Sequence, residues 1–306
     1  MIGAGLVLAL AVHAACSPAA LNDRMKKDAH DAKGKLSVSA RILDDHPSES
    51  DAGARRGQDS TQRYSFHGGR KAPMQSVYKL PIVVVALQMA QDRKLDLAKP
   101  VHVTPDDFIP PAGHSPLRDT HPKGDDFTVR ELLRRAIVDS DGSASDIVLQ
   151  LIGGTKAVRR SLKQQKVKGI RVMHTEAQLI DDAPAQYSDS AKADEMVEFL
   201  ARLQRGKLLN ADNTRMLRGW MTVAESGNER IRAKLPKGTV ADKTGSSGTY
   251  DGSTPATNDV GLVAMPGGKQ MAIAIFLTDA KADVVARNAL IADVAHEIWS
   301  CWAEGQ

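Results

Sequence analysis

A serine and a lysine three residues apart form the first pair in this chain that could do chemistry. Ser76 and Lys79 belong to the only Ser-x-x-Lys in the sequence, and they open a strongly apolar stretch, 80–90, that predicts a helix. At this spacing both side chains share one helix face, so the amino group of Lys79 can activate the Ser76 hydroxyl as a nucleophile. Alone, such a pair is more often an N-cap serine followed by a solvated lysine.

Two further triplets change that interpretation. Ser-Asp-Gly at 140–142 falls between two predicted helices, and Lys-Thr-Gly at 243–245 ends a predicted strand. Each triplet alone is a weak indication, because Ser-Asp recurs elsewhere and Lys-Thr-Gly can simply close a strand. Together with Ser-x-x-Lys, in this order, they are typical of class A β-lactamases and penicillin-binding proteins.

Over about residues 30–303 the sequence resembles the class A β-lactamases. The resemblance implies that Ser76 is the acyl-accepting nucleophile, Lys79 its proton-transfer partner and Ser140 the relay to the ring nitrogen. It also implies that Lys243 helps to bind the substrate carboxylate, and that the backbone N–H groups of Ser76 and Ser246 form the oxyanion hole. The substrate-binding positions expected from it are Thr244, Gly245, Ser246 and Arg230, of which Arg230 fits a surface arginine nearly as well.

A glutamate distinguishes a hydrolase from a transpeptidase here. Glu176 lies 36 residues beyond Ser140 and precedes a loop rich in Asp, Ala and Pro. This segment resembles the class A loop whose glutamate activates the deacylating water. We therefore expect Glu176 to be the general base. Two alternatives stay open: a penicillin-binding DD-peptidase or transpeptidase, and a non-hydrolysing β-lactam-binding domain.

Several positions depart from the common class A pattern. Ile180 and Asp146 each stand where asparagine is frequent, His174 replaces a loop-bracing arginine, and Gly142 replaces the asparagine of Ser-Asp-Asn. The first three, with Gln75 before the nucleophile, resemble the subgroup that contains PER- and CfxA-type enzymes. That resemblance makes a cephalosporinase or extended-spectrum profile a hypothesis, whereas Gly142 removes an amide that would contact the substrate side chain.

Composition excludes other classes. Basic residues exceed acidic ones by only four and mostly alternate with them, and aromatic residues make up 4% of the chain. A nucleic-acid-binding surface usually combines a basic stripe with aromatic residues, so no nucleic-acid partner is expected. The nine histidines show no metal-ligand spacing, and neither a metal nor a cofactor is expected. The expected partner is a small β-lactam, and nothing demands more than a monomer.

The N-terminus predicts export. Residues 2–12 are apolar and small residues follow, which is typical of a secretory signal peptide over 1–19 and of a periplasmic or secreted protein without a membrane span. Cys16 could instead accept a lipid. Because Cys16 would then be removed or modified, we expect no internal disulfide and an unpaired Cys301.

The pattern along the chain predicts an α+β fold of two lobes. Strands are expected at 36–43, 62–66, 239–243, 259–265 and 270–277, and helices at 77–91, 128–138, 144–152, 155–165, 190–204, 211–224 and 281–302. An antiparallel five-stranded sheet from 20–70 and 215–306, flanked by helices, would pack on an all-helical lobe of 71–214. The lobe would carry an Ω-like loop at about 174–190, with the active site in the groove between the lobes.

Overall fold

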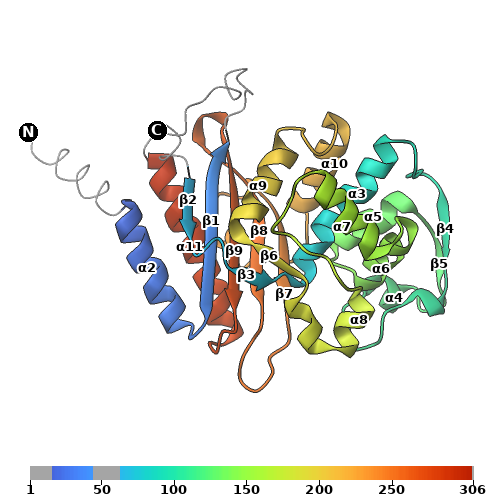
Figure 1. The fold of residues 1–306 in the computed structure, drawn as a ribbon, viewed down its shortest axis with the longest axis horizontal. Helices are drawn as coiled ribbons and strands as arrows, with labels where there is room; N and C mark the ends of the chain where they lie inside the picture. The colour runs from blue at the N-terminus through green and yellow to red at the C-terminus, as the bar shows by residue number, and fades with distance from the viewer. Residues whose placement is uncertain (1–15, 44–62, 305–306) are drawn as a thin grey trace, which may run out of the picture.

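The computed structural model describes residues 16–43 and 63–304. An antiparallel five-stranded sheet stands at the centre of one half of the molecule, with its strands in the order β2-β1-β9-β8-β7 (Figure 1). The central pair, β1 and β9, joins the two ends of the chain through nine paired residues, from Lys35 opposite Thr278 to Leu43 opposite Gln270. In sheet order the strands are β2 (Arg63–Phe66), β1 (Lys35–Leu43), β9 (Gln270–Thr278), β8 (Thr257–Ala264) and β7 (Val240–Ser246).

The sheet separates two hydrophobic cores. On one face, side chains such as Ile275 and Leu277 pack with helices α2 (Pro18–Asp31) and α11 (Val284–Glu304). On the other face, Phe276 joins the core of the helical lobe. Since successive strand residues point to opposite faces, the unbroken apolar run of β9 supplies both cores at once.

The helical lobe is built around one apolar helix. In α3 (Lys79–Gln91) nine residues from Lys79 to Leu87 are buried, so every face of this part of the helix is covered. Helices α5, α6 and α7 pack against it. The other helices here are α4 (Pro116–Thr120), α5 (Val129–Val138), α6 (Gly142–Leu151), α7 (Gly154–Gln164), α8 (Glu176–Asp181), α9 (Ala193–Gln204) and α10 (Ala211–Thr222), with 3₁₀ turns η2 (Gln75–Tyr78), η3 (Pro105–Asp107) and η4 (Ala183–Tyr187).

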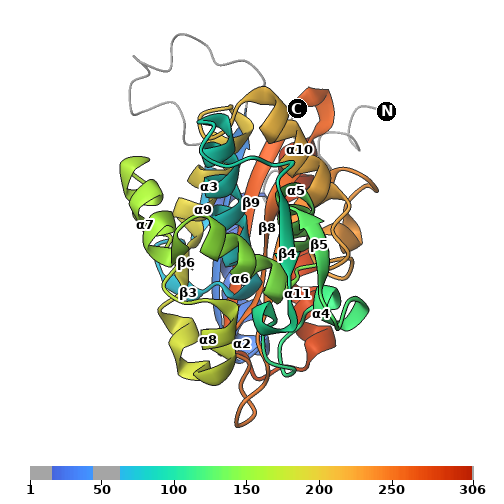
Figure 2. The same cartoon turned by 90° about the vertical axis from the view of Figure 1, so that its right-hand side faces the viewer.

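The predicted fold class is confirmed. The predicted helices and strands recur within a few residues, and two short two-stranded sheets are added to the lobe expected to be all helical. One pairs β3 (Lys71–Pro73) with β6 (Ser190–Lys192); the other pairs β4 (Pro100–Val103) with β5 (Asp125–Thr128) at the end farthest from the large sheet (Figure 1 and Figure 2). The lobe boundaries at 70 and 214 stay a prediction.

The expectation about the cysteines is wrong. Cys16 and Cys301 form a disulfide, with Cα atoms 5.2 Å apart, a normal separation for such a bond. The bond is possible because α2 and α11 cover the same face of the sheet, which brings the start of one beside the end of the other (Figure 1). The predicted signal segment lies mostly outside the described residues. Cleavage after residue 19, or lipidation of Cys16, is incompatible with this bond.

Removing the disulfide should destabilise the protein. The bond closes a loop with a sequence separation of 285, for which chain entropy gives about 5–6 kcal/mol as an upper value. Cys301→Ala should therefore lower Tm by roughly 5–15 °C. Thermal unfolding of the variant, and of the wild type with reductant, measures this. Ser300→Ala is the matched control in the preceding position. Free thiols at Cys16 and Cys301 in the unreduced mature protein would contradict the expectation.

Candidate active site

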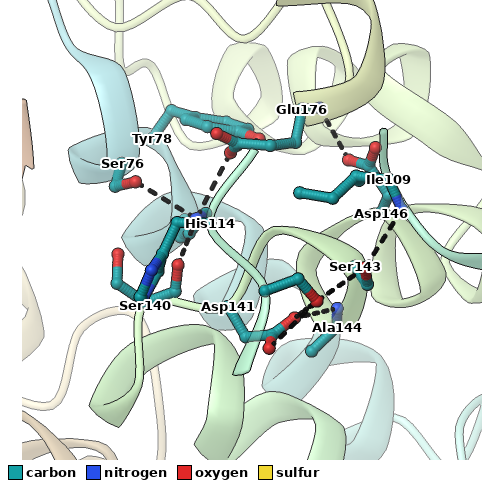
Figure 3. A network of polar contacts seen from close by, with 12 residues as sticks. Ser76, Tyr78, Ile109, His114, Ser140, Asp141, Ser143, Ala144, Asp146 and Glu176 are labelled. Carbon is teal, nitrogen blue, oxygen red and sulfur yellow. Dashed lines mark hydrogen bonds and ion pairs between the residues drawn. The ribbon is translucent and has the colours of Figure 1, made fainter. Parts of the chain in front are cut away.

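The nucleophile candidate lies at the junction of η2 and α3. The Nζ atom of Lys79 donates to Ser76 Oγ at 3.1 Å and to the Ser140 carbonyl oxygen at 2.6 Å, and it lies 3.2 Å from Glu176 Oε2 (Figure 3). Lys79 is 1% exposed. A buried amino group needs such partners, since its desolvation is otherwise too costly. The structure thus brings Ser76, Lys79, Ser140 and Glu176 into one polar cluster.

Backbone strain accompanies this cluster. Ser140 has φ of 55° and Gln75 has φ of 49°, in the left-handed region that side-chain-bearing residues seldom adopt. Gln75 directly precedes Ser76, and Ser140 is itself part of the polar cluster. Backbone strain of this kind is common at functional sites. The Gln75 side chain is held by a 2.6 Å hydrogen bond to Gln186. The fold therefore fixes the approach to Ser76 from both sides.

The second lysine comes from the sheet. Lys243 lies on β7, is fully buried, and its Nζ donates to Ser140 Oγ at 2.8 Å. Burial and the neighbouring Lys79 lower the pKa of Lys243 to about 7, while Asp242 and Asp259 oppose that shift. Ser140 thus connects the sheet lysine, through its hydroxyl, with Lys79 of the helical lobe, through its carbonyl oxygen.

Gly245 allows the sheet to approach the nucleophile turn. A Cβ at this position would lie 2.2 Å from the Met74 carbonyl oxygen and 3.1 Å from the Val77 nitrogen, so only glycine fits without movement of the backbone. The next residue, Ser246, is exposed at the end of β7. The predicted oxyanion-hole segment is therefore beside the turn that carries Ser76.

Arg230 lies behind the end of β7, contrary to its alternative as a surface arginine. It is 8% exposed. Its guanidinium donates to Ser246 Oγ at 2.6 Å, to the Asn258 carbonyl oxygen at 2.8 Å and to Asn288 Oδ1 at 2.9 Å. Together with Thr244, Ser246 and Asn288 it lines a cavity of about 290 Å³. Glu225 and Glu229 line the same cavity, so its charge is mixed, and Arg230 supplies its buried positive group.

Asp146 holds Glu176 in place through the backbone. Its two carboxylate oxygens accept from the N–H groups of Glu176 at 2.7 Å and Ala177 at 3.0 Å, at the start of α8. Burial raises the pKa of Asp146 to about 6, although these two hydrogen bonds act in the opposite direction. The Glu176 side chain is 15% exposed, so it contacts the buried Lys79 and still reaches solvent. A carboxylate, unlike an amide, can accept at both oxygens.

A histidine–aspartate pair braces the loop around Glu176. His174 Nδ1 contacts the Asp189 carboxylate, whose other oxygen accepts from the backbone N–H groups of Met173 at 2.6 Å and His174 at 3.2 Å. Asp189 is fully buried, and its carbonyl oxygen accepts from the Met74 N–H at 2.8 Å. The loop is therefore tied both across its own base and to the segment before Ser76, without the arginine.

Gly142 has no space for a larger side chain. A Cβ there would lie 2.4 Å from Ile109 Cδ1 and 2.8 Å from Glu176 Cγ. Ile109 and Ile180 also both reach the space above Gly113, where a Cβ would meet their Cδ1 atoms at 2.6 and 2.3 Å. The side chains of Ile109 and Ile180 thus occupy the region between the Ser-Asp-Gly turn and the Glu176 loop. In this region Gly142 and Ile180 stand where class A enzymes often have asparagine.

Contacts between distant segments supply residues that the sequence analysis did not identify as functional. The Tyr78 hydroxyl donates to Glu176 Oε2 at 2.8 Å. The Asp141 carboxylate, by accepting from Ser115, Leu117 and Ala144, fixes the turn beside Ser140. Asp141 and Ala144 have N-cap spacing, so part of this network had a signal in the sequence. Tyr78 had none.

This arrangement defines a serine hydrolase: a nucleophile with an adjacent amino group, a second polar relay and a carboxylate, all in one cluster where the helical lobe meets the sheet. A model of the β-lactamase enzyme family matches residues 20–302, and the chain belongs to that family.

Relatives and solved structures that are similar to this chain are also β-lactamases. The chain is 32% identical over 231 residues to the β-lactamase VEB-1 of Pseudomonas aeruginosa, covering 74% of this chain and 77% of that protein. It is also 32% identical to the extended-spectrum β-lactamase PER-1 of Pseudomonas aeruginosa, covering 78% of each. A β-lactamase structure from Chitinophaga pinensis aligns with a TM-score of 0.83 and 29% identity over 92% of this chain and 99% of that one. The TLA-1 extended-spectrum β-lactamase gives 0.84 and 28%, over 92% and 98%.

The prediction of a class A β-lactamase that hydrolyses β-lactams is therefore confirmed. The peptidase and the non-hydrolysing alternatives are not favoured.

The buried Lys243 should make kcat/KM of the enzyme fall at alkaline pH. Its pKa of about 7 means that the ammonium is present below neutral pH and is lost as pH rises. Because kcat/KM reports groups of the free enzyme, kcat/KM for a carboxylate-bearing cephalosporin should fall above about pH 7. Lys243→Arg keeps the charge and should move this limb to higher pH. Identical alkaline limbs in the two enzymes would contradict the role of Lys243.

The space at Gly142 can be tested with a single methyl group. Gly142→Ala should displace Glu176 or Ile109 and slow turnover by roughly tenfold or more, because misplacement of a reacting group by about 1 Å is costly. Gly219→Ala, also in a helix but with nothing within 4 Å of the added carbon, is the matched control. It should leave kcat unchanged and stabilise the protein slightly. Normal kcat in folded Gly142→Ala would show that the contact does not matter.

Proposed function

We propose that this enzyme opens β-lactam rings through an acyl-enzyme on Ser76. The observation that carries this proposal is the 3.1 Å contact between Lys79 Nζ and Ser76 Oγ within the cluster that also holds Glu176. The amino group, or a water held by Glu176, takes the Ser76 proton as Oγ attacks the lactam carbonyl. Ser140, between Lys79 and Lys243, passes a proton to the ring nitrogen when the C–N bond breaks.

Two backbone N–H groups, of Ser76 and Ser246, are proposed to stabilise the oxyanion. The close approach of Gly245 to the nucleophile turn supports this pairing. Preorganised donors of this kind are worth about a hundredfold to a thousandfold in rate each. Their separation depends on the packing of β7 against η2, so the fold itself sets the size of the hole.

Glu176 is the proposed base for deacylation. Its backbone is fixed by Asp146 and its side chain reaches the cluster from the loop. A water beside this carboxylate would lose a proton to it and attack the acyl carbon, after which the bond to Ser76 Oγ breaks. This step separates a hydrolase from a protein that stays acylated.

The substrates we propose are carboxylate-bearing β-lactams, including extended-spectrum cephalosporins. Thr244, Ser246 and Arg230 line the cavity at the end of β7, together with Glu225 and Glu229, and Thr244 Oγ1 lies 2.7 Å from Ser226 Oγ. Lys243 precedes Thr244 on the same strand. The cationic and hydroxyl groups suit the substrate carboxylate. Similarity to PER-1 and TLA-1, both named as extended-spectrum enzymes, supports the wider range.

We further propose that the enzyme is exported and acts as a monomer. In the part of the chain that the structure describes, no helix has the length and apolar character needed to cross a membrane. The disulfide between Cys16 and Cys301 fits an oxidising compartment. Export with Cys16 retained would reconcile the N-terminal pattern with that bond.

The roles of Ser76 and Glu176 can be separated by mass spectrometry. Glu176→Gln should accumulate a covalent adduct with a chromogenic cephalosporin, while turnover falls by roughly a thousandfold, since removing a general base costs about 10²–10⁴ in rate. Ser76→Ala should form no adduct at all.

Stopped-flow hydrolysis and intact mass of the same samples provide both readouts. Asp181→Asn, in the same loop, is the control for a lost carboxylate and should turn over normally. Unimpaired hydrolysis by folded Glu176→Gln would overturn the assignment of the base, and an adduct on Ser76→Ala would overturn that of the nucleophile.

A further inference from the structure

One carboxylate oxygen of Glu176 receives two donors. The Tyr78 hydroxyl donates to Oε2 at 2.8 Å, and Lys79 Nζ lies 3.2 Å from the same atom. Within the described part of the chain no hydrogen bond reaches the other oxygen, Oε1. Figure 3 shows the Tyr78 side chain reaching the Glu176 carboxylate from the side on which Ser76 lies. The two oxygens of the base are therefore unequal.

The Tyr78 hydroxyl has two polar neighbours, the Glu176 carboxylate and the Ser145 side chain. The ring itself is fully buried in the core of the helical lobe and packs with apolar residues. A buried hydroxyl is unfavourable unless it finds a partner. Burial and the charge of Glu176 hold the pKa of Tyr78 well above its usual range, so the group keeps its proton. It can only donate to the carboxylate.

We propose that Tyr78 is a positioning residue that selects Oε1 of Glu176 as the base for deacylation. This inference rests on the proposed role of Glu176. With Oε2 held by Tyr78 and Lys79, the water proton moves to Oε1 while the water oxygen bonds to the acyl carbon. The tetrahedral intermediate then collapses, the bond to Ser76 Oγ breaks, and Oγ regains a proton from the cluster. The same hydrogen bond is made to the carboxylate form of Glu176, which is the form that accepts the proton from water.

Other charged groups facing Glu176 are unaffected by removing this hydroxyl. Lys79 approaches from α3, Asp146 from α6 and Lys243 from β7, and the last two each interact electrostatically with Glu176. Tyr78→Phe keeps all three and the aromatic ring. A change in pH dependence therefore reports the lost hydrogen bond to Glu176, since the other neighbour of the hydroxyl, Ser145, does not titrate.

The test is the pH profile of deacylation in Tyr78→Phe. Without the donor the carboxylate form is less favoured, so the acid limb of kcat should move to higher pH by about one unit. On that limb kcat should fall about tenfold below wild type, whereas the acylation rate from the pre-steady-state burst should change less than about twofold. Tyr64→Phe is the matched control: it removes a buried hydroxyl that donates to Asn22 in the other lobe, and its profile should match wild type.

A double variant separates this inference from the role of Glu176. If Glu176→Gln traps the acyl-enzyme, Tyr78→Phe added to it should slow deacylation no further, because the two residues act through one group. If Glu176→Gln traps the adduct but the acid limb of Tyr78→Phe coincides with wild type, Tyr78 is only a packing residue and the inference fails. If Glu176→Gln does not trap the adduct, the proposed function fails first. A uniform loss of kcat at every pH in Tyr78→Phe, with lowered Tm, would also overturn the inference.

Discussion

Two buried lysines impose the main constraint on this structure. Lys79 and Lys243 are almost completely excluded from water where the helical lobe meets the sheet. Each brings a positive charge into a region where an unpaired charge is very costly. Ser140 accepts a hydrogen bond from each lysine, from Lys79 at its carbonyl oxygen and from Lys243 at its hydroxyl. These two hydrogen bonds stabilise the strained backbone of Ser140. The reactive cluster and the lobe interface are thus the same structure.

The acidic groups around the lysines balance this arrangement from both lobes. Glu176 faces Lys79 from the loop, and Asp242 and Asp259 lie near Lys243 in the sheet. Burial and the charge of Asp242 hold the pKa of Asp259 well above its usual range, while Arg232 pairs with Asp242. The sheet therefore supplies less negative charge to Lys243 than its sequence suggests, which leaves the lysine sensitive to pH.

Much of this could be predicted from the sequence because the chemistry is concentrated in short segments. Ser-x-x-Lys and Lys-Thr-Gly each require neighbouring residues at fixed spacing, and periodicity placed the helices and strands around them. The hydrogen bond between Tyr78 and Glu176 could not be predicted, since 98 residues separate the partners. The packing of Ile109 against Gly142 depends likewise on a tertiary approach. For Cys16 the prediction failed for another reason: the apolar N-terminus favoured removal of a residue that the structure pairs with Cys301.

Substitutions that looked like losses are accommodated in the structure. His174 still pairs across the loop with Asp189, and Asp146 accepts two backbone hydrogen bonds.

The order of the strands in the sheet affects when the protein can fold during its synthesis. Since β1 pairs with β9, the first strand has no partner on one side until residue 278 has been synthesised. A growing chain therefore keeps one edge of β1 unpaired through most of translation, and a chain that is still unpaired fits the proposed export, in which a polypeptide passes through a narrow channel before it folds.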